Sequence, residues 1–309
     1  MKVTARINNA REDLTQYRGR SQELPAIYTN APFTELVTYT GPKPFTHDTV
    51  SYIENENKTP GAPIKWARWQ ATERWAATLN KAGWGLGVYN AAAQNYTGGF
   101  FGKKGAKGGS TDGPTAYMSP LNTEIIDHNI SYTYSYVLIL GTLDEIREYA
   151  YKAHAKAQLP DLPVYRFADD RQHWSYINIV DTGWPIKGFL EFTEGSPDAV
   201  LLGPSTYWAA SPSHQLLIEA AYDGPPTKAK IYVRSHGQTG YAEENHVTFA
   251  LEPGGEFRTY AVALNAIPSY GLESGLNTMT GLKFMPFSTL NGKVNSFRIK
   301  SIRIVDAPN

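Results

Sequence analysis

Hydrophobic and polar residues alternate along much of the chain, which is the pattern of strands with one buried face. Val3, Ala5 and Ile7 share one face of the first such segment. Two further β-rich segments, 72–79 and 85–89, flank a short turn sequence that ends in glycine. This arrangement predicts a β-hairpin.

The middle of the chain combines a long β-rich run with a helical segment. Residues 124–140 predict one long strand that carries a bend or bulge. Residues 142–157 instead carry apolar side chains at helical spacing. Thr142 can cap this helix, and Glu145 stands three residues later, as a capping box requires.

Short β segments separated by glycine- and proline-rich turns fill the second half. We predict strands at 174–180, 216–222, 230–234, 247–251, 258–264, 282–286 and 297–305. The last of them breaks its alternation, because Phe297 and Ile299 fall on one parity and Ile302 and Ile304 on the other. A bulge at 300–301 would return all four side chains to the inward face.

These patterns predict a mostly β protein with two β-sandwich or jelly-roll domains and one α-helix near the domain junction. Because Pro160 and Pro163 are typical of a linker, we place the boundary near residue 158. The first domain, 1–157, is then a large sandwich that ends in the helix, and the second, 158–309, is a jelly roll. Since the sequence opens within a strand pattern, we also expect the N-terminus to be truncated.

Composition excludes several classes of function. The 309 residues include no cysteine, so a disulfide scaffold, a thiol nucleophile and a cysteine-ligated metal are excluded. The formal net charge is zero, which argues against nucleic acid or an anionic membrane surface as a partner. No apolar run approaches the roughly 20 residues of a membrane helix, and no signal peptide is visible.

Familiar catalytic motifs are missing as well. The sequence lacks a phosphate-binding loop of the Walker type, a nucleophile elbow and a zinc-binding His-Glu-x-x-His motif. Its seven histidines are scattered. We therefore expect no metal and no cofactor in a catalytic site. A structural calcium ion could stiffen the jelly roll, although no clustered carboxylate motif requires it.

Aromatic residues gather in one part of the first domain. Trp66 and Trp69 lie in a loop-like segment, and Trp84 and Tyr89 follow close behind. Flat aromatic rings stack on the apolar faces of sugar rings, so these four residues are candidates for substrate binding. The alternative is that they fill the core of a sandwich.

Carboxylates beside this cluster are the candidate catalytic groups. On a strand, Glu73 would share the apolar face, where a carboxylate is paired or has a raised pKa. A raised pKa suits a general acid, with Glu23 or Asp127 as the second carboxylate for glycosidic cleavage. The alternatives are an ion pair between Glu73 and Arg18 or Arg20, and an exposed loop position for Glu23.

The segment that begins at residue 124 offers a second chemistry. His128, Tyr132 and Tyr134 share one parity there. The histidine and a tyrosine could serve as base and acid in β-elimination from a uronic acid, and the tyrosines could line a glycan groove. The alternative for His128 is a hydrogen-bonded core histidine.

Two regions resemble known proteins. Residues 73–79 with 83–90, together with 22–28 and 126–129, resemble large bacterial β-sandwich proteins found among glycan-degrading enzymes. The C-terminal half, ending in 295–304, resembles jelly-roll carbohydrate-binding modules. The resemblance implies a carbohydrate-active protein, with further β structure upstream of Met1.

We therefore expect a secreted or periplasmic protein that acts on polysaccharide or oligosaccharide. Glycoside hydrolysis through Glu73 with Glu23 or Asp127 is the first hypothesis, and polysaccharide lysis through His128 is the second. The competing class is a non-catalytic glycan-binding protein, because β-sandwiches host both kinds of function.

Overall fold

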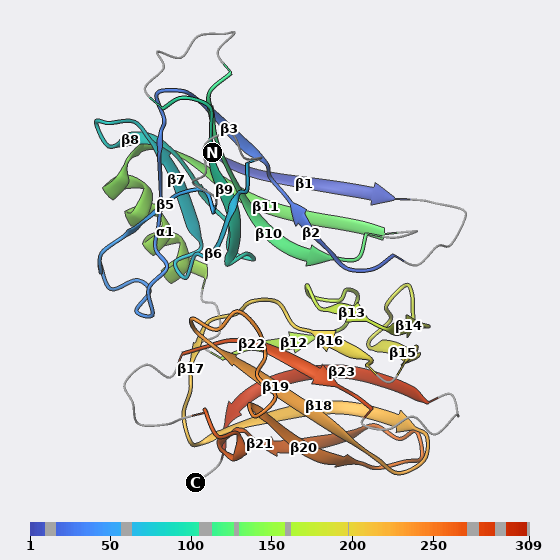
Figure 1. The fold of residues 1–309 in the computed structure, drawn as a ribbon. Coiled ribbons are helices and arrows are strands. Elements are labelled where there is room, and N and C mark those ends of the chain that lie inside the picture. The colour runs from blue at the N-terminus through green and yellow to red at the C-terminus, as the bar shows by residue number, and fades with distance from the viewer. Residues whose placement is uncertain are drawn as a thin grey trace. The chain divides into compact units, whose positions relative to one another are not determined.

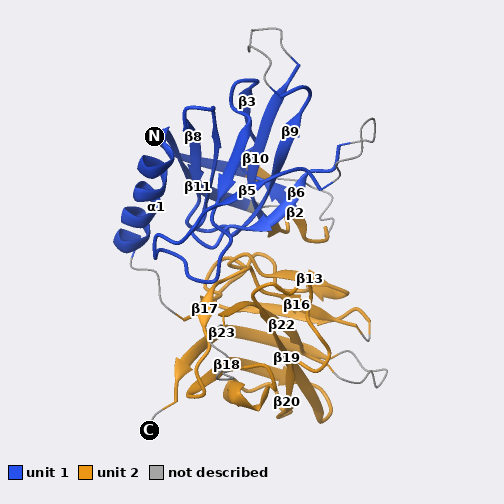
Figure 2. Ribbon diagram, turned by 60° about the vertical axis from the view of Figure 1, so that its left-hand side comes forward, with its two compact units in different colours: residues 1–7, 21–122, 131–159 blue, residues 8–20, 123–130, 160–309 orange. Residues whose placement is uncertain are grey.

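A computed structural model describes residues 1–9, 17–56, 64–104, 113–126, 130–157, 162–196, 198–270, 278–287 and 295–307. It confirms the predicted fold class, since strands dominate and α1 (Leu143–Ala157) is the only α-helix among these residues. Contacts divide the chain into two compact units (Figure 2). Unit 1 comprises 1–7, 21–122 and 131–159, and unit 2 comprises 8–20, 123–130 and 160–309. The boundary predicted at 158 falls outside the described residues.

Unit 1 contains two sheets (Figure 1). Sheet A has the order β1 (Lys2–Asn9), β11 (Ile130–Thr142), β8 (Trp84–Tyr89), β7 (Trp75–Leu79), β4 (Glu35–Thr38) and β5 (Ser51–Ile53). Sheet B has the order β2 (Arg20–Glu23), β10 (Thr115–Glu124), β9 (Asn95–Phe101) and β6 (Ala67–Gln70), and β3 (Ile27–Asn30) also pairs with β10. The predicted hairpin is confirmed as β7 and β8.

Apolar side chains hold the layers of unit 1 together. One face of sheet A meets sheet B through a core that includes Leu36, Val88 and Met118. The other face lies under α1, whose Ile146 and Ala150 pack against a second cluster. The predicted capping box is present, because Glu145 Oε2 accepts the Thr142 N–H at 2.8 Å and the Glu145 N–H donates to Thr142 Oγ1 at 3.3 Å. No helix in the described part of the chain is long and apolar enough to cross a membrane.

Three local predictions for unit 1 are wrong. The run 124–140 is not one strand, because β10 ends at Glu124 and β11 begins at Ile130. The expected loop-like segment contains β6, which takes in Trp69. Residue 73 precedes β7 in a turn in which Arg74 has a φ of 63°, so strand parity does not apply to Glu73.

Unit 2 also contains two sheets. Sheet C has the order β14 (Ile179–Asp181), β15 (Leu190–Glu194), β23 (Ser296–Asp306), β18 (His214–Asp223) and β21 (Arg258–Ala263), and β12 (Val164–Arg166) pairs with β23. Sheet D has the order β13 (Ser175–Ile177), β16 (Val200–Leu202), β22 (Thr278–Met285), β19 (Thr227–Ser235) and β20 (His246–Leu251), and β17 (Trp208–Ala209) pairs with β22. A short 3₁₀ helix, η1 (Leu264–Ala266), follows β21.

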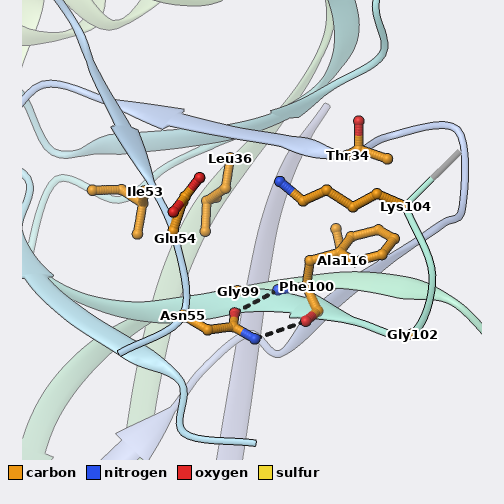
Figure 3. Close-up of a pocket in the computed structure, with 10 residues that line it drawn as sticks. All are labelled: Thr34, Leu36, Ile53, Glu54, Asn55, Gly99, Phe100, Gly102, Lys104 and Ala116. Carbon is orange, nitrogen blue, oxygen red and sulfur yellow. Dashed lines mark hydrogen bonds between the residues drawn. The ribbon is translucent and has the colours of Figure 1, made fainter. Parts of the chain in front are cut away.

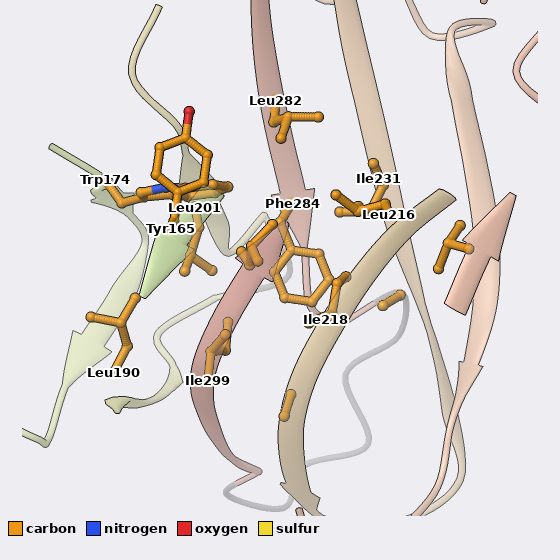
Figure 4. Close-up of a cluster of buried hydrophobic side chains, with 14 of the residues drawn as sticks. Tyr165, Trp174, Leu190, Leu201, Leu216, Ile218, Ile231, Leu282, Phe284 and Ile299 are labelled. Atoms are coloured by element: carbon orange, nitrogen blue, oxygen red, sulfur yellow. The ribbon is translucent and has the colours of Figure 1, made fainter. Parts of the chain in front are cut away.

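Side chains from both sheets fill a single core in unit 2 (Figure 4). The predicted bulge in the last strand is confirmed at Lys300. Glu219 of β18 faces Ser301 while Ala220 faces Ile299, so Lys300 is the extra residue. The bulge keeps the apolar side chains on both sides of it within this core.

Candidate functional site

Three aromatic rings form a row on sheet B. Tyr28 of β3 stands directly opposite Tyr117 of β10, and their ring centroids are 4.9 Å apart. On the other side, the Trp66 ring lies 5.2 Å from that of Tyr117. We call Tyr28, Tyr117 and Trp66 the aromatic row. Tyr117 is buried between its neighbours, whereas Tyr28 is 64% exposed, so the row has an accessible end.

A glycine allows Trp66 to reach the row. Gly99 of β9 stands opposite Tyr117 in the strand ladder. A Cβ at this position would lie 2.9 Å from the Trp66 ring and 2.0 Å from Asn55 Oδ1. The missing side chain therefore leaves room for the indole and for the amide over the sheet.

A carboxylate borders the aromatic row. The Tyr117 hydroxyl donates a hydrogen bond of 2.5 Å to Glu23 Oε2. Burial raises the pKa of Tyr117, and the hydrogen bond to Glu23 raises it further, so the phenol stays protonated. Glu23 itself is exposed at the end of β2. The structure thus places Glu23 beside aromatic rings.

A pocket of about 310 Å³ adjoins the row (Figure 3). Asn55 fixes one wall, because its Nδ2 donates to the Phe100 carbonyl and its Oδ1 accepts the Phe100 N–H, both at 2.9 Å. The side chains of Glu54 and Lys104 supply a carboxylate and an ammonium group to the lining. Gly99 also lines the pocket, whereas Phe100 and Ala116 of its lining stand one position along the ladder from Gly99 and Tyr117 and so point to the other face of sheet B.

The prediction that Glu73 has a raised pKa is wrong. Its side chain is 0% exposed, and Arg147 binds it with two hydrogen bonds of 2.9 Å. The Trp75 indole, the Tyr151 hydroxyl and the Phe45 N–H donate three more, at 2.9, 2.7 and 2.9 Å. Burial by itself raises the pKa of Glu73, but the hydrogen bonds it accepts, above all those from Arg147, hold this pKa below the ordinary value.

Glu73 is therefore a buried, ionised group within an ion pair, as the alternative hypothesis for it proposed. Its partner is Arg147 of α1, and neither of the expected arginines, Arg18 and Arg20, fills that role. A general acid needs a proton near neutral pH and access to the leaving oxygen. The environment of Glu73 provides neither.

The other predicted residues are dispersed. Tyr89 is only 4% exposed and packs in the cluster under α1, so it is a core residue. Trp69 packs against the core between the sheets, with its ring 6.0 Å from that of Tyr96. Trp84 is exposed at the start of β8, on sheet A, and its ring lies 6.3 Å from that of Phe33.

Tyr132 and Tyr134 form a stack of half-buried rings on β11. Their centroids are 6.0 Å apart, and Tyr136 continues the stack at 6.2 Å from Tyr134. Asp127 and His128 lie outside the described residues. The expected base of a lyase and the third expected carboxylate therefore have no described position.

Sequence reasoning missed Tyr28, Tyr117 and Asn55. Tyr28 and Tyr117 lie in unrelated segments, and only the pairing of β3 with β10 brings them together. The alternation around Tyr28 was visible in the sequence, but alternation does not say which face of a strand meets another strand's aromatic side chain. Among the described residues, no group of three or more potential ligand side chains could hold a metal ion.

No family model matches the chain, and no curated protein matches it. Among solved structures, it is similar to the second N-terminal cellulose-binding domain of β-1,4-glucanase C from Cellulomonas fimi. The TM-score is 0.34 and the identity 19%, over 48% of this chain and 94% of that domain.

Two other solved structures show a similar degree of likeness. The module CtCBM11 matches with a TM-score of 0.29 and 16% identity, over 49% of this chain and 100% of the module. The glycoside hydrolase domain of Endo-D from Streptococcus pneumoniae R6 matches with a TM-score of 0.30 and 9% identity, over 49% of this chain and 21% of that one. Likenesses at this level do not define a function.

Proposed function

We propose that the protein binds polysaccharide and that the aromatic row of unit 1 is its binding platform. The observation that carries the proposal is the row itself, in which Tyr28 of β3 and Trp66, just before β6, are each in ring contact with Tyr117 of β10. A ring as exposed as Tyr28 on a sheet face, backed by a buried aromatic neighbour, is a rigid apolar surface. Such a surface suits the flat C–H face of a pyranose.

A polar group beside the row would orient the sugar. Glu23 offers its carboxylate next to the rings, where it accepts the Tyr117 hydroxyl. Ligand sites combine apolar walls with a few placed polar groups in this way. Hydroxyl groups of the glycan would donate to this carboxylate.

Binding without cleavage is the better supported of the two classes of function. Most glycoside hydrolases use two carboxyl groups about 5 to 10 Å apart, one of which is protonated. Glu73, the expected acid, is sealed from solvent and held ionised by Arg147. The proposal therefore assigns Glu23 a binding role, and a polysaccharide partner is consistent with a secreted or periplasmic location.

A glycan panel with matched variants tests the platform. Tyr28→Ala and Trp66→Ala should each weaken binding to the recognised polysaccharide at least about tenfold, which equals about 1.4 kcal/mol. Tyr52→Ala is the control, because Tyr52 is a tyrosine of equal exposure, 63%, on β5 of the other sheet. Unchanged affinity in the Tyr28 variant, or equal losses in the Tyr28 and Tyr52 variants, would contradict the proposal.

A product assay separates binding from catalysis. The wild-type protein is incubated with each recognised polysaccharide while reducing ends and the absorbance of unsaturated sugars are followed. We expect neither signal to rise above the blank. Release of reducing ends would restore the hydrolase hypothesis. Unsaturated products that disappear in His128→Ala would establish the lyase hypothesis.

A further inference from the structure

A second cluster of charged and aromatic side chains lies in unit 2, on sheet D and the loop that follows β19. It consists of Lys230, Tyr232, Arg234, Tyr241, Glu243 and Lys283, which we call the lysine–tyrosine cluster. Tyr232 of β19 stands opposite Lys283 of β22 in the strand ladder. The cluster's side chains on β19 and β22 lie on the outer face of sheet D, because their neighbours Ile231, Val233 and Leu282 point into the core.

Lys283 holds a distinctive position in this cluster. Its Nζ lies 3.5 Å from the centroid of the Tyr232 ring and 5.4 Å from that of Tyr241. The lysine is half-buried, and burial lowers its pKa, while the nearby Glu243 opposes the shift and Lys230 adds to it. The ammonium group is thus held in a fixed place on aromatic rings rather than extended into water.

The carboxylate of the cluster is already engaged by other groups. Glu243 pairs with Lys230 at 3.1 Å and accepts the Tyr232 hydroxyl at both oxygens, at 3.0 and 2.9 Å. Among the described residues, no carboxylate forms an ion pair with Lys283. The positive charge of Lys283 is therefore not neutralised by an ion pair with any described carboxylate.

Within the part of the chain that the structure describes, Arg234 adds a second cation that forms no ion pair with a carboxylate. Its guanidinium donates to the hydroxyls of Ser205 and Thr280, at 3.0 and 3.2 Å, and lies over the Tyr241 ring at 5.5 Å. The positive side chains of the cluster thus outnumber its single negative one.

Glycine shapes this site as it shapes the aromatic row. A Cβ at Gly281 would lie 2.6 Å from the Tyr241 hydroxyl oxygen. The missing side chain allows Tyr241 to lie over β22, where its hydroxyl donates to the Leu282 carbonyl at 2.9 Å. Contacts with the backbone of β22 therefore hold Tyr241 in its place in the cluster.

We propose that the lysine–tyrosine cluster is a second binding site, for a polysaccharide that carries anionic groups, and that the Lys283 ammonium receives the anion. A uronate carboxylate and a sulfate ester share the required chemistry, namely negative oxygens beside a sugar ring. An ammonium bonds such oxygens strongly, and Tyr241 supplies an aromatic surface nearby. The inference does not depend on the aromatic row, which belongs to the other unit.

The test compares two lysines of one sheet in the full-length chain. Lys283→Met keeps an unbranched apolar side chain at this position and removes the charge. Lys228→Met removes the same charge from an exposed position on β19. Affinities are measured for polygalacturonate, dextran sulfate and neutral dextran, and thermal melting verifies that both variants are folded.

We expect the wild-type protein to bind one of the two anionic polymers and Lys283→Met to bind it about tenfold more weakly, with Lys228→Met and Lys283→Arg close to wild type. The polymer that is bound identifies the carboxylate or the sulfate as the ligand group. Equal losses in Lys283→Met and Lys228→Met would reveal general charge attraction and overturn the proposal, as would no binding to either anionic polymer. Tyr28→Ala should leave this binding intact, so failure of one site is distinguishable from failure of the other.

Discussion

Replacing Arg147 by methionine should destabilise unit 1, because it leaves a buried carboxylate without its cation. The Glu73 side chain is 0% exposed and that of Arg147 is 12% exposed. Removal of one partner from a buried ion pair costs about 3 to 5 kcal/mol. Three donors to Glu73 remain in the variant, so we expect the lower end of that range, about 3 kcal/mol.

Two further variants test this expectation. Glu73→Leu combined with Arg147→Met removes both charges, and apolar replacement of a whole buried pair is often close to neutral. The double variant should therefore be more stable than Arg147→Met alone. Lys152→Met is the control on the same helix, because the Lys152–Glu148 pair is exposed and such pairs contribute less than about 1 kcal/mol.

The assay is urea denaturation at neutral pH, followed by tryptophan fluorescence. Because two units can unfold in separate steps, hydrogen exchange at the amides of α1 assigns the loss to unit 1. A change below about 0.5 kcal/mol in Arg147→Met, or a loss equal to that of Lys152→Met, would refute the assignment of Glu73 as a buried structural charge.

Three other outcomes follow from the structure. The pKa of Glu73 in the folded protein lies below its ordinary value of 4.5. The stability that the ionised group contributes is therefore complete above about pH 5 and is lost as the pH falls through the folded pKa. In acid titrations followed by fluorescence, Glu73→Gln should lose less stability over that range than the wild-type protein. Gly99→Ala should lower the free energy of unfolding by about 1 to 3 kcal/mol and weaken glycan binding, because the new Cβ would collide with Asn55 and disturb its two hydrogen bonds to Phe100. Urea denaturation and binding measurements test this, and wild-type values in both would be contrary evidence. Thr142→Ala should cost about 1 kcal/mol and speed amide exchange in the first turn of α1, whereas unchanged exchange would mean that the cap is not in use.

Local features of the fold were predictable because their physical causes are local. The capping box at Thr142 depends on residues three apart, and the hairpin of β7 and β8 depends on a short turn. The bulge at Lys300 could be read from a change of parity, since an apolar side chain must face the core on both sides of it. The prediction of a single strand over 124–140 was wrong because β propensity does not mark where one strand ends and the next begins.

The mostly β architecture follows from the order of residues along the chain, as does the supply of carboxylates and aromatic side chains. Their roles depend on which of them the folded chain brings together. Glu73 meets Arg147 across 74 positions of sequence, and that contact settles its charge. Tyr28 meets Tyr117 only because β3 pairs with β10, and the missing side chain of Gly99 brings Trp66 to the same row. A pKa and a binding surface both depend on neighbours in space, whereas alternation records only which side of a strand is buried.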